Sequence, residues 1–393
     1  MCLRTVNKED TRVRFENSKF VSLLIIAVMV ALTSCAAPQK KVYDIVWPLP
    51  PEEPRIRYVD VWQANLDIAG SEGGVAGSLF GEEVISIRKP YGVATDKEGR
   101  VYVTDAGAVY VFDARNKKFS SIGTEIGPGR LSLPASVAVS NSDGKVYVTD
   151  IGAKRVFVYN KDGKYLTAIG HEKELENPIG IAIDDERQKL YVVDSKKHAV
   201  SVYSLEGKLI QTIGSRGNGP AQFNQPSFMT LDSSGNIYVV DTQNFRVQVF
   251  DPEWKLIRTI GQLGDVPGNF SRPKGIAIDS EGHIYVVDAA FQNVQIFDKE
   301  GQLLLFVGSG GTRPGEFALP AGIAIDGEDR IYVVEQFASR IQIFQYLGEK
   351  WKKSHPELMK IPEPASKEGP VKKNESNKET PVENENQTEK NAR

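Results

Sequence analysis

Short apolar runs separated by tight turns recur along most of the chain. One example is IYVVD (237–241), which is followed by the turn TQNF and then by RVQVFD (246–251). Short runs rich in Val, Ile, Tyr and Phe and bounded by Gly, Asp, Asn and Pro are typical of β-strands. These runs are apolar on both faces, which favours sheets buried between neighbouring sheets. Because no part of this region shows sustained helical periodicity, the pattern predicts an all-β fold.

The pattern repeats six times along the chain. Each repeat contains the motif Tyr-x-x-acid and opens with a proline, and the first five repeats have the pattern of four strands. The acidic residues are spaced by 45, 44, 47, 47 and 47 residues, and a repeat of this length indicates a propeller or a solenoid. The six acidic positions are Asp105, Asp150, Asp194, Asp241, Asp288 and Glu335.

These sequence motifs resemble NHL repeats, which form six-bladed β-propellers. The resemblance lies in RPKGIAIDSEGHIYVVDAAFQNVQIFDKEGQLLLFVG (272–308), in the linker GNGPAQFNQP (217–226) and in the Asn244–Arg246 pair. It implies a six-bladed β-propeller of four-stranded antiparallel blades. The expected units are about 85–123, 131–170, 176–214, 224–261, 271–308 and 318–353.

The sixth unit lacks a fourth strand. It ends in RIQIFQYLGEKWKK (340–353), which has no further strand and no closing glycine. An unclosed propeller would expose open sheet edges. The segment RIRYVDVWQ (55–63) has the composition of the missing strand, so we predict that it closes the sixth blade and that the propeller domain spans residues 55–353.

Most recurring side chains are expected to be architectural. A catalytic residue is needed once, whereas the acid occurs six times, so Asp241 and its counterparts are predicted to accept backbone N–H bonds at their own corners. The repeated tyrosines are predicted to pack between blades. The linker phenylalanines are predicted to hold the blade-to-blade connections, and they are Phe223, Phe270 and Phe317.

The N-terminus predicts export and lipidation. An apolar run (20–33) follows basic residues and is too short to span a membrane, which is typical of a signal peptide. The word LTSC, ending at Cys35, resembles a bacterial lipobox; the resemblance implies a signal peptide over 1–34 and acylation of the Cys35 thiol. The alternative is an ordinary secretory signal with a chance cysteine. Ala36 rather than aspartate follows the cysteine, so the resemblance favours the outer membrane if the cell has one.

Two further segments lie outside the repeats. Residues 35–54 contain PLPPEEP, which favours extended polyproline structure and a spacer between lipid and propeller. Residues 354–393 are rich in Lys, Glu, Asn and Pro, which predicts a disordered polar tail. The expected location is the cell envelope, on its periplasmic or extracellular side.

Composition excludes several kinds of chemistry. The formal net charge of −3 gives no support for a nucleic-acid partner. The two cysteines, Cys2 and Cys35, cannot form a CxxC zinc, haem or redox motif. The four histidines are scattered among a linker, a corner, a turn and the tail, so the sequence predicts no metal, no cofactor and no catalytic residue.

Two functions remain open. In such blades, the linkers and the corners between second and third strands emerge on one face, and loops on a rigid scaffold often carry function. A membrane-anchored, non-catalytic platform would bind a protein or a glycan there. The alternative is a metal-dependent propeller enzyme of the lyase, lactonase or hydrolase type, and the scattered histidines favour the platform. Candidate contact residues on this face are Arg155, His198, Arg216, Asn244, Arg246, Gln292, Asn293 and Arg340.

Overall fold

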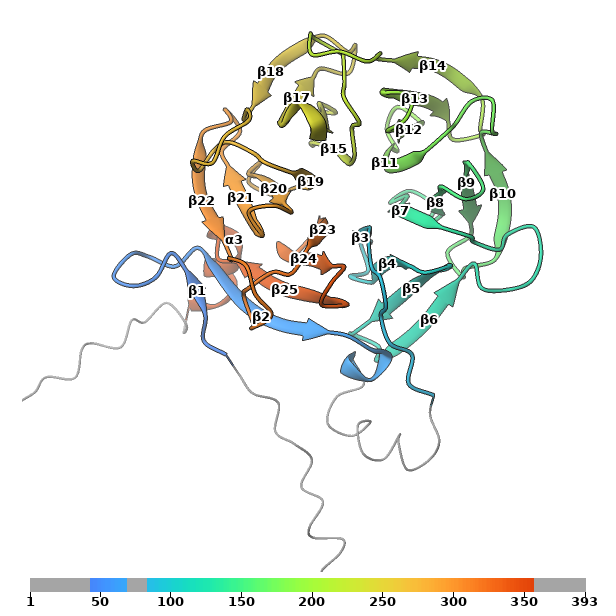
Figure 1. Ribbon diagram of the computed structural model, residues 1–393. Coiled ribbons are helices and arrows are strands. Elements are labelled where there is room, and N and C mark those ends of the chain that lie inside the picture. Colours follow the sequence, from blue (N-terminus) through green and yellow to red (C-terminus); the bar gives the residue numbers. More distant parts are fainter. Residues whose placement is uncertain (1–42, 69–82, 357–393) are drawn as a thin grey trace, which may run out of the picture. The chain divides into compact units, whose positions relative to one another are not determined.

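The computed structural model describes residues 43–68 and 83–356 (Figure 1). The chain divides into a compact unit, Met1–Trp351, and a second unit, Lys352–Arg393, of which residues 352–356 are described. The predicted signal peptide, Cys35 and nearly all of the predicted tail lie outside the described residues. None of the helices in the described part of the chain has the length and apolar character needed to cross a bilayer.

The first unit is the predicted six-bladed propeller of four-stranded antiparallel blades, and an additional N-terminal strand gives the sixth blade a fifth strand (Figure 1). Blade 1 contains β3 (Val93–Thr95), β4 (Val101–Asp105), β5 (Ala108–Asp113) and β6 (Lys118–Ile122). Blade 2 contains β7 (Pro134–Val139), β8 (Val146–Asp150), β9 (Arg155–Tyr159) and β10 (Tyr165–Ile169). Blade 3 contains β11 (Pro178–Asp184), β12 (Lys189–Asp194), β13 (Ala199–Ser204) and β14 (Leu209–Ile213).

The other three blades follow the same order from the axis outwards. Blade 4 contains β15 (Met229–Leu231), β16 (Ile237–Asp241), β17 (Arg246–Phe250) and β18 (Leu256–Ile260). Blade 5 contains β19 (Pro273–Ile278), β20 (Ile284–Asp288), β21 (Asn293–Phe297) and β22 (Leu303–Val307). Blade 6 contains β23 (Pro320–Ile325), β24 (Arg330–Glu335), β25 (Arg340–Tyr346) and the N-terminal strands β1 (Val46–Trp47) and β2 (Ile56–Trp62). The described helices are η1 (Asn65–Ile68), η2 (Thr242–Asn244) and α3 (Glu349–Ser354).

The predicted closure of the ring is confirmed. Strand β2 pairs antiparallel with β25, from Ile56 opposite Tyr346 to Trp62 opposite Ile341. The C-terminal part of the spacer predicted over 35–54 is not a free extended segment. Strand β1 pairs with β2, and residues 48–54 lie in the loop between them. Val46 and Trp47 are half-buried, and the indole of Trp47 contacts Phe344, so this pairing covers apolar surface that a free spacer would leave in water.

The hydrophobic core lies between the blades. Six clusters of buried side chains each combine residues from two neighbouring blades, as expected when sheets stack around an axis. Tyr102 of blade 1 packs among blade 2 residues, and Tyr332 of blade 6 packs among blade 1 residues. The predicted inter-blade role of the repeated tyrosines is therefore confirmed.

Glycines let the innermost strands approach closely at the axis. A Cβ at Gly322 would lie 2.6 Å from the Tyr91 carbonyl oxygen, and one at Gly275 would lie 2.4 Å from the Ala321 carbonyl oxygen. These inner strands contact one another in the order β3, β7, β11, β15, β19 and β23, and β23 then contacts β3 again. Blade 1 therefore faces blade 4 across the axis.

Candidate binding face and axial site

The blade corners and the linkers lie on the same face of the ring. The Gln243 amide of the blade 4 corner donates to the Asn224 carbonyl of the incoming linker at 3.0 Å, and Gln336 of the blade 6 corner donates to Leu319 at 3.1 Å. We call this surface the linker face, and we call the surface of first-to-second and third-to-fourth strand turns the turn face. The linker face comprises segments 85–89, 123–133, 170–177, 214–225, 261–272 and 308–319, with corners 105–108, 150–155, 194–199, 241–246, 288–293 and 335–340.

The six repeated carboxylates lie at these corners. The predicted acceptance of backbone N–H groups from their own corners is confirmed for four of them, Asp105, Asp150, Asp194 and Asp288. Asp150 accepts the Ala153 amide of its own corner at 2.9 Å and the Ser132 amide of the incoming linker at 2.6 Å. All six side chains are buried, and each accepts a backbone N–H from the segment that enters its blade. Each carboxylate therefore ties the incoming linker to its blade. Asp241 and Glu335 differ from the prediction, because at their own corners they accept from the side chains of Arg246 and Arg340 and not from backbone N–H groups.

Two of the predicted contact residues are committed to this architecture. Arg246 donates from Nε to Asp241 at 2.9 Å and from Nη2 to the Gly219 carbonyl at 3.0 Å. Arg340 donates from Nε to Glu335 at 2.6 Å and from Nη1 to the Thr312 carbonyl at 2.7 Å. Both guanidinium groups are largely buried. Both residues were predicted to contact a partner, but their guanidinium N–H groups are bonded to the carboxylates and linker carbonyls of the propeller itself.

Three other predicted residues also bond within their own blade or linker. Asn244 donates to the Gly217 carbonyl at 2.8 Å and to Asp241 at 2.8 Å, so it shares a partner with Arg246. His198 Nδ1 accepts the Gln225 amide at 3.0 Å. Arg155 donates from Nε to the Ala153 carbonyl at 3.2 Å. These residues position loops on the linker face.

The remaining three lie closer to solvent. Arg216 is exposed in the linker between blades 3 and 4. Gln292 lies against Gly310, where an added Cβ would sit 2.4 Å from Gln292 Oε1. Asn293 is half-buried, and its Oδ1 is buried without a hydrogen-bond partner. The eight predicted residues are spread over five blades and do not form one cluster.

The linker face exposes large apolar side chains. Phe337, at the corner of blade 6, is 76% exposed. It lies next to the linker that enters blade 6, because the preceding residue, Gln336, bonds to the carbonyl of Leu319 at the end of that linker. In the described part of the chain, no large exposed apolar side chain lies on a first-to-second or third-to-fourth strand turn, although Leu49, in the loop between β1 and β2 at the same end of blade 6, is 69% exposed. The exposed apolar residues of the linker face are Ile126, Leu133, Leu263, Val266, Leu319 and Phe337.

Basic residues outnumber acidic ones on the same face. Nine basic side chains and four acidic side chains are exposed on the described linker-face segments. This excess gives the surface a positive potential that attracts anionic groups, although the whole chain is slightly acidic. The basic residues are Arg88, Lys89, Arg130, Lys154, Lys173, Lys196, Arg216, Arg272 and Arg313, and the acidic residues are Glu125, Glu172, Glu176 and Asp265.

An axial cluster closes the centre of the ring near the linker face. Tyr91 of blade 1 stacks on Phe228 of blade 4 with ring centroids 5.3 Å apart. Because these blades face each other, the contact lies on the axis. Lys274 of blade 5 places its ammonium 5.4 Å from the Tyr91 ring centroid and donates to Gln336 Oε1 of blade 6 at 3.3 Å.

Lys274 is the unusual group of the axial cluster. Its side chain is buried, and burial followed by the charge of Arg272 lowers the pKa of Lys274 to about 8. Lys274 was not among the residues predicted from the sequence. Its position in the repeat could have indicated it, because the residue after the opening proline is uncharged in the other five units. Those residues are Tyr91, Ala135, Ile179, Ser227 and Ala321.

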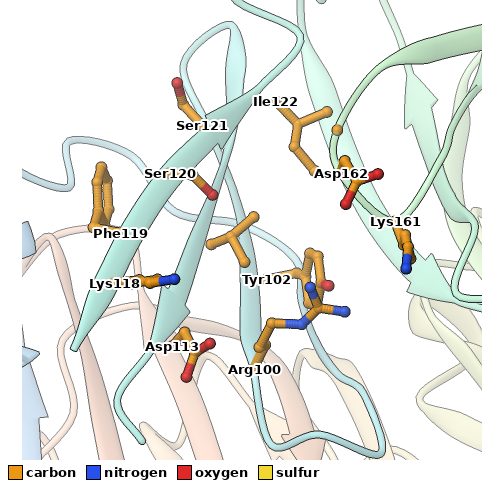
Figure 2. Close-up of a pocket in the computed structure, with 12 residues that line it drawn as sticks. Arg100, Tyr102, Asp113, Lys118, Phe119, Ser120, Ser121, Ile122, Lys161 and Asp162 are labelled. Carbon is orange, nitrogen blue, oxygen red and sulfur yellow. The ribbon is translucent and has the colours of Figure 1, made fainter. Parts of the chain in front are cut away.

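Two of the hollows between the blades bear on a binding site. One, of about 250 Å³, runs along the axis and is lined by aliphatic residues of the six inner strands, with Phe228 among its lining residues. The other, of about 420 Å³, lies between blades 1 and 2 and has charged walls, which include Arg100, Asp113 and Lys161 (Figure 2). The charge of Arg100 is already paired, since it contacts Asp96 at 2.6 Å and Glu98 at 2.9 Å.

The described residues hold no group of three or more His, Cys, Asp or Glu side chains placed to bind a metal ion. At the axis, the inner strands present mainly aliphatic side chains with the hydroxyl groups of Thr95, Ser136 and Thr230, and the ammonium of Lys274 lies beside Tyr91. This donor set does not fit a catalytic metal, which needs about three carboxylate or imidazole ligands and is repelled by a neighbouring cation.

The fold and its repeat define the class of protein, a six-bladed β-propeller of four-stranded blades. Residues 50–267, more than half of the chain, match the SMP-30/Gluconolactonase/LRE-like region, so the chain belongs to this family. Residues 280–354 match a further family described as a 6-bladed beta-propeller. No curated protein matches the chain.

Solved structures with the same fold have diverse descriptions. An auxiliary nutrient binding protein from Bacteroides thetaiotaomicron is 13% identical, with a TM-score of 0.53 over 66% of this chain and 70% of that chain. A protein of unknown function from the same organism is 20% identical, with a TM-score of 0.52 over 66% and 70%. A streptogramin B lyase is 16% identical, with a TM-score of 0.50 over 67% and 95%. These similarities show the fold, and the fold alone does not fix a function.

Proposed function

We propose that this propeller is a non-catalytic binding protein of the cell envelope, anchored by a lipid on Cys35, that recognises a protein or glycan partner through its linker face. The observation that carries the proposal is the contrast between the two faces of the ring. The linker face exposes six large apolar side chains, Phe337 and Ile126 among them, within a basic surface, whereas on the other face Leu49 of the β1–β2 loop is the one described turn residue of this kind. Interfaces commonly combine apolar anchors with such a charged surround.

The chemistry of the repeated carboxylates also favours binding over catalysis. Each of the six accepts backbone N–H bonds and is buried, so none is placed to act as a general base on a substrate. The metal-dependent alternative makes a separate prediction, since the purified protein would then hold a stoichiometric metal ion. Elemental analysis of the protein decides between the two.

The lipid anchor gives a first prediction. We expect the mature chain to begin at an acylated Cys35 and to remain with the membrane fraction. Cys35→Ser should abolish the lipid mass and release the protein from the membrane. Mass spectrometry of the N-terminal peptide, together with membrane fractionation, checks this expectation, and an unmodified cysteine in the membrane-bound wild-type protein would contradict it.

The binding face gives a second prediction. Phe337→Ser should reduce capture of the envelope partner by at least tenfold, because a buried aromatic anchor contributes about 2 kcal/mol or more to a protein interface. Its effect on folding should be small, since the side chain is mostly exposed in the free protein. Crosslinked pull-downs from envelopes and thermal unfolding measure the two effects.

A matched substitution provides the control. Phe306 is also exposed, but it lies within β22, the outermost strand of blade 5, and not on a linker or corner. Phe306→Ser should therefore leave partner capture unchanged. Equal loss of capture in the two variants, or undiminished capture by Phe337→Ser, would count against the linker face.

A further inference from the structure

Lys274 is a buried cation whose charge the described part of the protein leaves without a counterion. The residue is 7% exposed, and its ammonium carries three N–H donors. One donor is used by the Gln336 side-chain oxygen at 3.3 Å, and the Tyr91 ring offers its face at 5.4 Å. Among the described charged groups, the one that acts on Lys274 is the guanidinium of Arg272, which is repulsive.

The fold does not require a charge at this position. The other five units place uncharged residues after the opening proline, and the ring closes around them equally well. Burying an unpaired charge is costly. An uncompensated cation that serves no structural pairing is best explained by an anion that binds to it.

The surroundings define the kind of anion. We propose that Lys274, Gln336, Tyr91 and Phe228 form a binding site for a single carboxylate group at the axis of the ring, entered from the linker face. Lys274 supplies the charge, and the Gln336 amide lies beside it as a second donor. The stacked rings of Tyr91 and Phe228 supply apolar surface for the carbon skeleton of the ligand.

The site is held rigidly and lies beneath the basic face. The Lys274 carbonyl accepts the Ser227 hydroxyl at 3.2 Å, and the carbonyl of Pro273 accepts the Thr242 hydroxyl at 2.9 Å. Gln336 and Tyr91 are half-buried, whereas Arg272 is exposed and adds positive charge at the entrance. The pKa of Lys274, about 8, leaves the ammonium charged at neutral pH.

The proposal deepens the proposed function, because it names the chemistry that the linker face would recognise, and small probes test it separately. Titration calorimetry of the purified protein with benzoate should show binding, and the neutral isostere benzamide should show none. Lys274→Met should abolish benzoate binding. Gln336→Leu should weaken it by about tenfold, and Lys299→Met on the turn face should leave it unchanged.

The unliganded variants give a second readout. Lys274→Met should melt at a higher temperature than the wild-type protein, because it removes a buried unpaired charge while retaining a side chain of similar length.

A peptide with a free C-terminal carboxylate, compared with its amide, distinguishes a terminal group of a larger partner from a small free acid. The proposal is overturned if benzoate and the peptide acid both fail to bind at millimolar concentration, if Lys274→Met still binds them, or if inorganic phosphate binds more tightly. If the wild-type protein captures its partner but binds no carboxylate, the axial site is contradicted and the proposed function is unaffected.

Discussion

A variant lacking residues 43–63 is expected to lose its cooperative unfolding transition altogether. The deletion removes β1 and β2, and with them Ile56, Tyr58 and Trp62, which are buried in the two clusters on either side of blade 6. Truncating one such side chain costs about 2–5 kcal/mol, and a domain is stable by about 5–15 kcal/mol in total. The deletion also exposes the unpaired edge of β25. Circular dichroism during heating and size-exclusion chromatography measure the loss.

The control for this deletion lies in the same strand. Val59 is exposed at the irregularity between Tyr58 and Asp60, so Val59→Ala should change stability by about 0.5 kcal/mol or less. A deletion variant that unfolds cooperatively at the wild-type temperature would show that β2 does not close the ring.

Arg340→Met should lower the free energy of unfolding by about 3–5 kcal/mol, because it leaves the Glu335 carboxylate buried without its cation. The wild-type arginine bonds both Glu335 oxygens, at 2.6 and 3.3 Å, and three linker carbonyls, at 2.7, 2.8 and 3.3 Å. Arg155 occupies the same repeat position in blade 2, where its Nε donates to the Ala153 carbonyl. Arg155→Met should therefore cost about 1 kcal/mol or less, as measured by chemical denaturation of both variants.

The loss in Arg340→Met should depend on pH in a defined direction. Burial raises the pKa of Glu335 even though Arg340 opposes the shift, so the folded protein binds this proton more readily than the unfolded chain. A raised carboxyl pKa favours folding below the unfolded value, and this contribution is lost as pH rises through the folded value. Removing Arg340 raises the pKa of Glu335 further. The variant should therefore be less destabilised near about pH 5 than near about pH 8, and an equal loss at both would contradict the assignment.

Repetition explains why most of the fold could be predicted from the sequence. The tyrosine and the acid recur in every unit, so the packing role of Tyr238 and the corner role of Asp150 could be predicted from what six sheets around an axis require. At its own corner Asp241 instead accepts from the side chains of Asn244 and Arg246, which the repeat did not predict. The missing strand of blade 6 could be predicted because one incomplete unit and one unassigned strand remained. The strand β1 has no counterpart in the other blades, and its pairing with β2 was not predicted.

The axial cluster could not be predicted because its contacts cross the ring. Tyr91, Phe228 and Lys274 come from three blades and meet only when the ring closes. In the sequence, each lies one or two residues after the opening proline of its unit, where the residue type varies from unit to unit. The arginines show the opposite case: Arg246 and Arg340 read as free side chains on a binding face, but linker carbonyls distant in sequence take up their donors.

The claim at the centre of this account is that repeated residues hold the ring and that the linker face meets the partner. Photo-crosslinking in intact cells tests it most directly, with a photoreactive residue at position 337 on the linker face or at position 299 on the turn face. The account predicts discrete crosslinked adducts from position 337 and none from position 299. Adducts from position 299 alone, or the same adducts from both positions, would contradict it.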